Sequence, residues 1–179
     1  DAFLKSEADF EADFLTVNPY MGSDGVLPFL KNCEEYDKGI FVLVKTSNPS
    51  SAELQDQRLE NGMYVFELMA RYVSFWGNSS IGQSGFSRVG AVVGATFPEQ
   101  AKQIREILPN NIFLVPGFGA QGGSAEDIRP CFDANREGVL VNSSRGIIYA
   151  YKNRPDLKEK DFALAAREEV LRMKEALKF

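Results

Sequence analysis

The chain has 179 residues, 44% of them hydrophobic, and a net charge of -5 at pH 7. This length supports one domain with a sizeable core, and the acidic balance argues against a nucleic-acid-binding surface, which needs clustered Lys and Arg. The chain has no histidine, which excludes Ser-His and Cys-His nucleophile pairs and imidazole metal ligands.

Five short apolar runs, each ending in a polar or glycine-containing turn, predict five β-strands. In chain order, the expected strands are residues 14–17, 39–44, 89–94, 112–115 and 138–142. No low-complexity tract or linker separates them, so we expect residues 1–179 to belong to a single domain.

Helical patterns fill the segments between the strands. A first helix follows Asp24, and Pro28 confines its start to that neighbourhood. A second helix runs from Tyr64 to Trp76, with its apolar side chains at helical spacing. Residues 52–61, which precede it, are loop or a short helix, and the sequence leaves both open.

Two further helices are expected after the third strand and at the end of the chain. Thr96 and Glu99 predict a capping box, with a proline in the first turn. The last helix begins at about Asp161. The residues expected on its buried face are Phe162, Ala166, Val170, Met173 and Leu177.

The fourth strand runs into a loop, residues 116–123, that holds four glycines within seven residues. Glycine reaches positive φ and has no Cβ, so such a loop can aim backbone N–H groups at an anion. Ser124 to Asp127 then reads as a capped helix start, which adds partial positive charge. A phosphate pocket is the functional interpretation, and a plain turn between strand and helix is the alternative.

Strands that alternate with helices predict an α/β fold with a parallel sheet and right-handed crossovers. In such folds the binding residues gather at the carboxyl ends of the strands. The residues at those ends are Asn18, Ser47 with Asn48, Thr96, 116–121 and 143–145. These polar and glycine residues would therefore lie in one layer.

Three side chains in that layer are candidates for ligand binding. Arg145 could grip a phosphate bidentately or form an internal ion pair, and its position favours neither. Ser47 could contact a polar ring edge, although a turn or helix cap is favoured on local grounds. Gln121 could bind a phosphate or tie down its own loop, and neither is preferred.

Two other polar residues at strand ends are weaker candidates. Lys45 could serve as an acid or a Schiff-base amine, but no carboxylate is near it in sequence, so a solvated or paired lysine is favoured. Asn18 would more often close a turn than bind a ligand.

The two cysteines indicate a reducing compartment. Cys33 and Cys131 are far apart and lack partners at metal-ligand spacing, so two buried thiols are expected rather than a disulfide or a zinc site. The sequence shows no secretory leader and no apolar run long enough to cross a bilayer. We therefore expect a cytoplasmic protein with no membrane partner.

The number of strands is too small for a closed barrel. A (β/α)8 barrel takes ~250 residues and eight strand–helix units, whereas five are expected here. The first residues, 1–13, lack an initiator methionine and resemble the end of a helix begun elsewhere. They favour three further units before Asp1 over an open sheet.

The strand ends, taken together, resemble those of orotidine 5'-phosphate decarboxylases of the longer bacterial subgroup. The motifs that carry the resemblance are Leu15-Thr16-Val17-Asn18-Pro19-Tyr20-Met21-Gly22, Val44-Lys45-Thr46-Ser47-Asn48-Pro49, Val93-Gly94-Ala95-Thr96, the stretch 114–123, and Val141-Asn142-Ser143-Ser144-Arg145. They run in order from the first strand to about Tyr151.

The resemblance implies a homodimeric (β/α)8 TIM-type barrel, of which this chain supplies strands 4 to 8. It also implies the last step of UMP synthesis, the removal of CO2 from orotidine 5'-phosphate without a metal or other cofactor. The implied partners are the nucleotide substrate and a second copy of the chain. Another phosphate-binding barrel, such as a sugar-phosphate aldolase or epimerase, and a non-catalytic nucleotide-binding fragment are the alternatives.

The resemblance also assigns residues. It places the pyrimidine-contacting serine on Ser47, the mobile phosphate-gripping loop on Pro116 to about Asp127, the glutamine that meets phosphate and base on Gln121, and the phosphate arginine on Arg145. The other substrate-binding candidates are Asn18, Gly119 and Ser144.

One departure from the family pattern is serious. The family's Lys and Asp cluster, carried by an Asp-x-Lys-x-x-Asp motif, has no match in this chain and would lie just before Asp1. In such enzymes the lysine protonates the C6 carbanion left by CO2, so we expect no catalytic residue within residues 1–179.

Overall fold

The computed structural model describes residues 2–119 and 122–178, and its centre is one parallel β-sheet. The strands are β1 (Phe14–Val17), β2 (Gly39–Lys45), β3 (Ser87–Val93), β4 (Asn111–Pro116) and β5 (Val139–Asn142). They are hydrogen-bonded in sequence order, and every neighbouring pair is parallel. The five predicted strands and the α/β class are confirmed, with strand ends moved by at most two residues.

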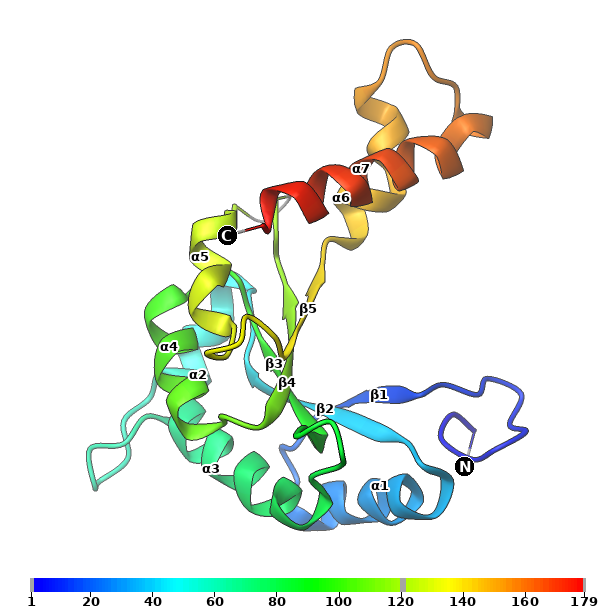
Figure 1. Ribbon diagram of the computed structural model, residues 1–179. Helices are drawn as coiled ribbons and strands as arrows, with labels where there is room; N and C mark the ends of the chain where they lie inside the picture. The colour runs from blue at the N-terminus through cyan, green and yellow to red at the C-terminus, as the bar shows by residue number, and fades with distance from the viewer. Residues whose placement is uncertain (1, 120–121, 179) are drawn as a thin grey trace.

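Helices and 3-10 turns connect the strands (Figure 1). The helices are α1 (Ser23–Tyr36), α2 (Ala52–Gln55), α3 (Val65–Gly77), α4 (Pro98–Ile107), α5 (Ala125–Ile128), α6 (Ser144–Ile148) and α7 (Phe162–Ala176). The 3-10 turns are η1 (Pro49–Ser51), η2 (Asn78–Ser80), η3 (Arg129–Cys131), η4 (Ala150–Asn153) and η5 (Glu159–Asp161). The segment that the sequence left open, residues 52–61, therefore begins with a short helix.

The predicted helix starts are only partly right. The first helix is as expected, since α1 begins at Ser23, close to Asp24, and contains Pro28. The prediction of a capping box between Thr96 and Glu99 is wrong, because the residue at the N-cap position of α4 is Phe97, whose side chain makes no capping hydrogen bond. The Thr96 hydroxyl is buried and has no hydrogen-bond partner among the described residues. The capped start at Ser124 is confirmed, since its hydroxyl accepts a hydrogen bond from the backbone N–H of Asp127.

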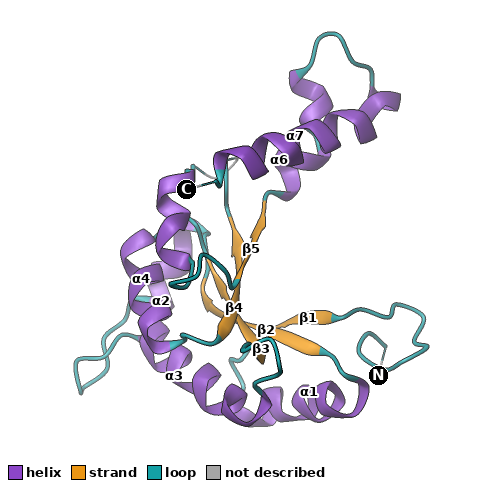
Figure 2. Ribbon diagram, in the orientation of Figure 1, coloured by secondary structure: helices purple, strands orange, loops and turns teal. Residues whose placement is uncertain are grey.

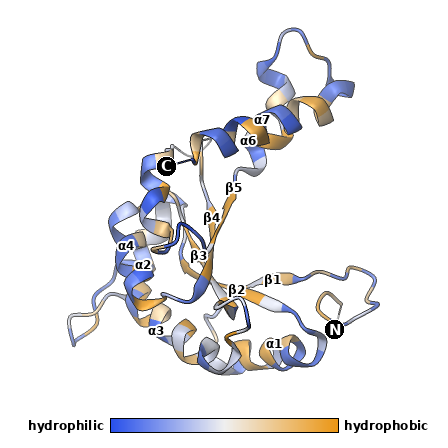
Figure 3. Ribbon diagram, viewed as in Figure 1, coloured by the Kyte–Doolittle hydropathy of each residue, from blue (hydrophilic) through white to orange (hydrophobic). Residues whose placement is uncertain are grey.

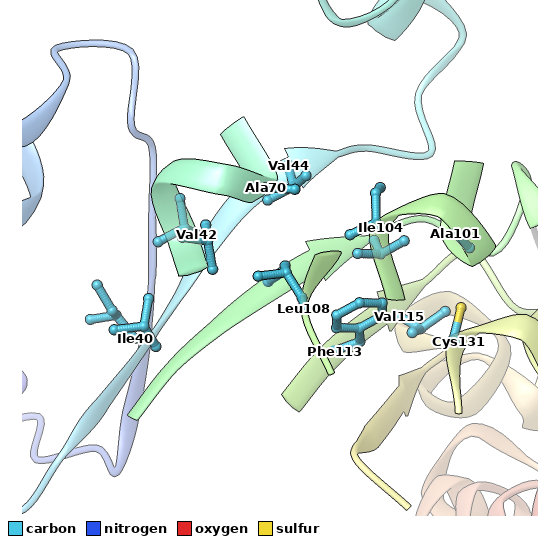
Figure 4. Packing of buried hydrophobic residues seen from close by; sticks show 14 of the residues in the cluster. Ile40, Val42, Val44, Ala70, Ala101, Ile104, Leu108, Phe113, Val115 and Cys131 are labelled. Carbon is cyan, nitrogen blue, oxygen red and sulfur yellow. The ribbon is translucent and has the colours of Figure 1, made fainter. Parts of the chain in front are cut away.

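The core lies between one face of the sheet and a layer of helices that includes α1, α3 and α4 (Figure 2). Alternate strand residues such as Ile40, Val42 and Val115 are fully or almost fully buried there. They pack with helix residues such as Ala70 and Ile104 (Figure 4). Burying each large aliphatic side chain contributes about 1.5–3 kcal/mol, so this layer supplies most of the stabilisation of the sheet.

The opposite face of the sheet is apolar but has no described helix over it (Figure 2). Leu43, Ile112 and Leu114 point to this face and are only half-buried, and Leu140 is 51% exposed. Parallel sheets are normally covered on both faces. In addition, β1 and β5 each pair with one strand only among the described residues, so both edges of this part of the sheet are unpaired.

The carboxyl-terminal segment extends away from the helix layer, with α6 and α7 lying beyond β5 (Figure 1). Hydrophobic residues on α7 can be followed in Figure 3. Of the face predicted for this helix, only Met173 is fully buried, whereas Phe162 is 55% and Val170 39% exposed. In the described part of the chain, no helix is both long and apolar enough to span a membrane.

Candidate functional site

The carboxyl ends of β2 and β3 touch each other through their backbones. A Cβ placed on Gly94 would lie 2.8 Å from the backbone nitrogen and 2.9 Å from the Cα of Ser47. Because position 94 has no side chain, Ser47 is held against the end of β3.

The ends of β3, β4 and β5 are joined in the same way. The Ala95 N–H donates to the carbonyl of Pro116 at 2.9 Å, and Gly123 lies so close to Ala95 that their Cβ positions would be 2.6 Å apart. The Ser143 hydroxyl, which is buried, donates to the carbonyl of Phe118 at 2.8 Å. The carboxyl ends of β2 to β5 therefore form one continuous rim, as the sequence predicted.

A small hollow of about 60 Å³ opens between the ends of β4 and β5. Its lining residues are Pro116, Gly117, Phe118, Asn142, Ser143, Ser144 and Arg145. Three of the predicted site residues, at positions 116, 144 and 145, are thus brought together. The hollow is far smaller than the ~300–1,000 Å³ of a pocket that encloses a whole organic ligand, so its size suits one small group such as a phosphate.

Arg145 is exposed beside this hollow. Among the described residues, none forms a hydrogen bond or an ion pair with its guanidinium. The internal ion pair, which the sequence held as an equal alternative, is not found in that part of the chain. The five N–H donors of this side chain are available for an anionic ligand.

The glycine loop after β4 uses several of its backbone N–H groups internally. The N–H groups of Gly119, Gly122 and Gly123 donate to carbonyls within the loop, at 2.8, 2.9 and 3.2 Å. The φ angles of Gly117, Gly119 and Gly122 are 99°, 68° and 94°, which explains the choice of glycine. The prediction that loop N–H groups point at an anion is therefore wrong for these three donors.

Gln121 lies outside the described residues, so its assigned contacts with phosphate and base stay predictions. Gly119 is described, but it lines a neighbouring groove with Ser143, Arg154 and Arg172 rather than the hollow beside Arg145. It is still close to the rim, since a Cβ on Gly119 would lie 3.9 Å from the Ser143 hydroxyl.

Ser47 is half-buried on the rim. The residue that precedes η1 is Asn48, and no side chain caps that turn. Within the described chain, the Ser47 hydroxyl has no hydrogen-bond partner, so the locally favoured role as a helix cap is not what the structure shows. The hydroxyl is free to meet a ligand.

Asn18 closes a turn, the role that the sequence favoured for it. Its Oδ1 accepts a hydrogen bond from the backbone N–H of Tyr20 at 3.0 Å. It lines a larger, mainly apolar groove with residues that include Thr46, Tyr72 and Trp76, not the hollow beside Arg145. The structure therefore places Asn18 in this groove and not in the hollow that Pro116, Ser144 and Arg145 line.

Lys45 is the paired lysine that the sequence favoured, and it is no candidate acid or Schiff-base amine. Its Nζ is fully buried, 2.7 Å from Asp56 Oδ1 and 3.5 Å from Ser51 Oγ. The carboxylate partner is eleven residues further along the chain. No local sequence pattern reveals this partner, because η1 and α2 fold the intervening segment back on itself.

The sequence also gave no role to two rim residues that the structure makes prominent. The sequence predicts for Ser143 only a place in a polar turn, yet its buried hydroxyl connects β5 to the glycine loop through a hydrogen bond. Gly94 was counted as a strand residue, and its contact with Ser47 depends on a pairing between β2 and β3 that no local pattern reveals.

A parallel α/β sheet that carries, at the carboxyl ends of its last strands, a small hollow and an arginine without a partner among the described residues is an arrangement typical of phosphate-binding α/β proteins. More specifically, the chain belongs to the orotidine 5'-phosphate decarboxylase / HUMPS family, whose model matches residues 2–159.

Relatives of known name agree with this family. The chain is 59% identical over 151 residues to the orotidine 5'-phosphate decarboxylase of Caldicellulosiruptor bescii, a match that covers 84% of this chain and 49% of that protein. It is 45% identical over 172 residues to the enzyme of Rhodopirellula baltica, covering 94% of this chain and 55% of the relative.

A solved structure gives the same answer. The structure of Leishmania donovani OMP decarboxylase superposes with a TM-score of 0.70 at 34% identity, covering 94% of this chain and 58% of that chain. The chain thus spans about half the length of the curated relatives that it matches.

Proposed function

We propose that the protein containing this chain decarboxylates orotidine 5'-phosphate to UMP, in pyrimidine biosynthesis. The observation that carries the proposal is the guanidinium of Arg145, which has no partner among the described residues and lies beside a phosphate-sized hollow, at the strand ends of a chain that belongs to the decarboxylase family. The named relatives support the same reaction.

The proposed whole protein is a single (β/α)8 barrel, of which residues 1–179 supply strands 4 to 8. The support is the exposed apolar face of the sheet and its two unpaired edges. Three further strands between β5 and β1 would pair both edges and cover that face, because the interior of such a barrel is packed with side chains.

Phosphate and pyrimidine are bound by different parts of the rim in this proposal. Arg145 grips two phosphate oxygens with its planar fork, and Pro116 and Ser144 line the same hollow. Ser47 hydrogen-bonds a polar edge of the pyrimidine, and Gln121 reaches both groups from the loop.

The proton donor comes from outside this chain. Decarboxylation leaves a carbanion at C6 of the pyrimidine, which must receive a proton from an acid held within hydrogen-bond reach. Lys45 cannot be that acid, since its Nζ is buried against Asp56. We place a lysine flanked by aspartates in the barrel units that precede Asp1.

The remaining parts of the proposal rest on the family resemblance. They are a homodimer, a cytoplasmic location, and a reaction that needs no metal or other cofactor. The large exposed side chains of Tyr20 and Met21, 81% and 75% exposed at the carboxyl end of β1, are consistent with a protein contact there.

The test is a decarboxylation assay on the full-length protein. Orotidine 5'-phosphate should be converted to UMP with release of CO2, while sugar phosphates are left unchanged. A full-length protein that is folded but releases no CO2, or that cleaves or epimerises a sugar phosphate, would contradict the proposal.

A further inference from the structure

Lys45 is a buried charge two residues before the proposed pyrimidine contact, and its position in β2 is irregular. In the pairing of β2 with β3, Leu43 is opposite Val92 and Lys45 is opposite Val93, so one residue of β2 is extra. Such a bulge re-aims the side chains that follow it.

The bulge turns Lys45 away from the face where a ligand would lie. Paired residues of a parallel sheet point to the same face, and Val93 belongs to the core beneath the helices. The side chain of Lys45 therefore enters the helix layer, where its Nζ lies 4.1 Å from the ring centroid of Phe97 and 2.7 Å from Asp56 Oδ1.

This ion pair closes the loop that carries Ser47. Lys45 precedes the loop and Asp56 follows α2, so the pair joins the two ends of the segment 46–55. Next to it, the Thr46 N–H donates to Gln55 Oε1 at 2.9 Å, and Gln55 Nε2 donates to Thr46 Oγ1 at 2.8 Å. Lys45 and Thr46 at the start of the loop are thus tied to Asp56 and Gln55 at its end.

A third tie fixes the loop to the neighbouring strand. The Gly94 N–H donates to the carbonyl of Lys45 at 2.7 Å, and the backbone of Ser47 rests on Gly94. A buried ammonium is tolerated only with a partner, so any movement of the loop ends that separates Lys45 from Asp56 is costly.

We propose that Lys45 and Asp56 form a positioning pair that sets the place of Ser47 for the pyrimidine. This inference rests on the proposed function, in which Ser47 meets the base. Neither residue touches the substrate, and both act through the loop. A misplacement of about 1 Å far from the chemistry can lower an enzyme's rate about 100-fold, so such a pair can matter for catalysis.

The test is a double-mutant cycle in kcat/KM for orotidine 5'-phosphate, on the full-length enzyme with D56N, S47A and S47A/D56N. We expect D56N to lower kcat/KM at least about fivefold, and S47A/D56N to match S47A within about twofold, because residues that act through one contact are not additive. The matched control is E11Q, which breaks the 2.8 Å ion pair of Glu11 with Lys38 at the opposite end of β2 and should leave kcat/KM unchanged.

The outcomes separate the two proposals. No turnover by the wild type, or no effect of S47A, contradicts the proposed function. If S47A lowers kcat/KM but D56N has no effect, the positioning pair is overturned and the proposed function stands. The same holds if the effects of S47A and D56N on kcat/KM multiply fully. If D56N does not fold, K45M/D56L removes both charges from the same place and takes its position in the cycle, with the same criteria.

Discussion

Ser47 and Gly94 are in backbone contact, and the gap between them has no room for a methyl group: a Cβ at position 94 would lie 2.8 Å from the Ser47 nitrogen. This contact joins the ends of β2 and β3 and fixes the residue proposed to meet the pyrimidine.

We expect G94A in the full-length enzyme to displace Ser47 and to lower kcat/KM roughly 10- to 100-fold. The control is G82A, since a Cβ on Gly82 would meet only a carbonyl oxygen at 3.8 Å. Steady-state kinetics with orotidine 5'-phosphate check this. Equal kcat/KM values for the two variants would show that the contact is unimportant for the site.

Arg105 should be essential for stability although it lies away from the rim. It is buried, and its guanidinium donates to the carbonyls of Cys131, Leu108, Asn111 and Gly138 at 2.8–3.0 Å. Burial lowers the pKa of Arg105 to about 10. We expect R105M to lower the free energy of unfolding by about 3–5 kcal/mol, because it leaves buried carbonyls without donors.

Chemical denaturation of the full-length protein measures this effect. R71M, at an exposed position on α3, is the control and should change stability by less than about 0.5 kcal/mol. If R105M lowers the free energy of unfolding no more than R71M does, the hydrogen bonds from Arg105 to the four carbonyls do not hold β4, η3 and the start of β5 together.

The two thiols should be unreactive in the folded protein. Burial raises the pKa of Cys33 to about 11 and that of Cys131 to about 12, from an ordinary value of 9.0. Iodoacetamide at pH 8 should therefore modify neither residue until the protein is unfolded, as peptide mass mapping would show. Modification of either thiol in the native protein at the rate of the unfolded chain would be inconsistent with this burial.

The same shifts predict how stability depends on pH. Between pH 9 and these raised pKa values, the unfolded chain loses thiol protons that the folded chain retains. The folded state then binds more protons, so the free energy of unfolding falls as pH rises through this window. Denaturation at pH 8 and pH 10, with C33A/C131A as the control that should show a weaker dependence, measures the effect.

The 179-residue chain on its own should be unstable and inactive. Its sheet has one uncovered apolar face, and β1 and β5 are open edges, which favour association with other chains. We expect no cooperative thermal transition by circular dichroism and no release of CO2, in contrast to the full-length protein. Decarboxylation by the isolated chain would refute the proposed division of labour.

Local patterns predicted most of the fold, because each strand is a short apolar run ended by a turn. They failed where a long-range contact decides the outcome. The direction of Lys45 depends on a bulge against β3, and its partner Asp56 is brought near by two short helical turns. Thr96 looked like a helix cap, but α4 begins later, after Phe97.

The candidate site was predictable to a similar degree. Pro116 ends β4, and Ser144 and Arg145 come just after β5, the adjacent parallel strand, so their meeting at one hollow could be expected from the order of the strands. The internal bonding of the glycine loop could not, since it depends on φ angles that sequence alone leaves open.

The central claim is that the rim binds the phosphate of a pyrimidine nucleotide through Arg145. Isothermal titration of the full-length protein with UMP and with uridine, for the wild type, R145A and the exposed-site control R71A, tests it most directly. R145A should weaken UMP binding roughly 10- to 100-fold and leave uridine binding unchanged, while R71A should bind both ligands as tightly as the wild type. UMP binding by R145A as tight as that of the wild type would contradict it.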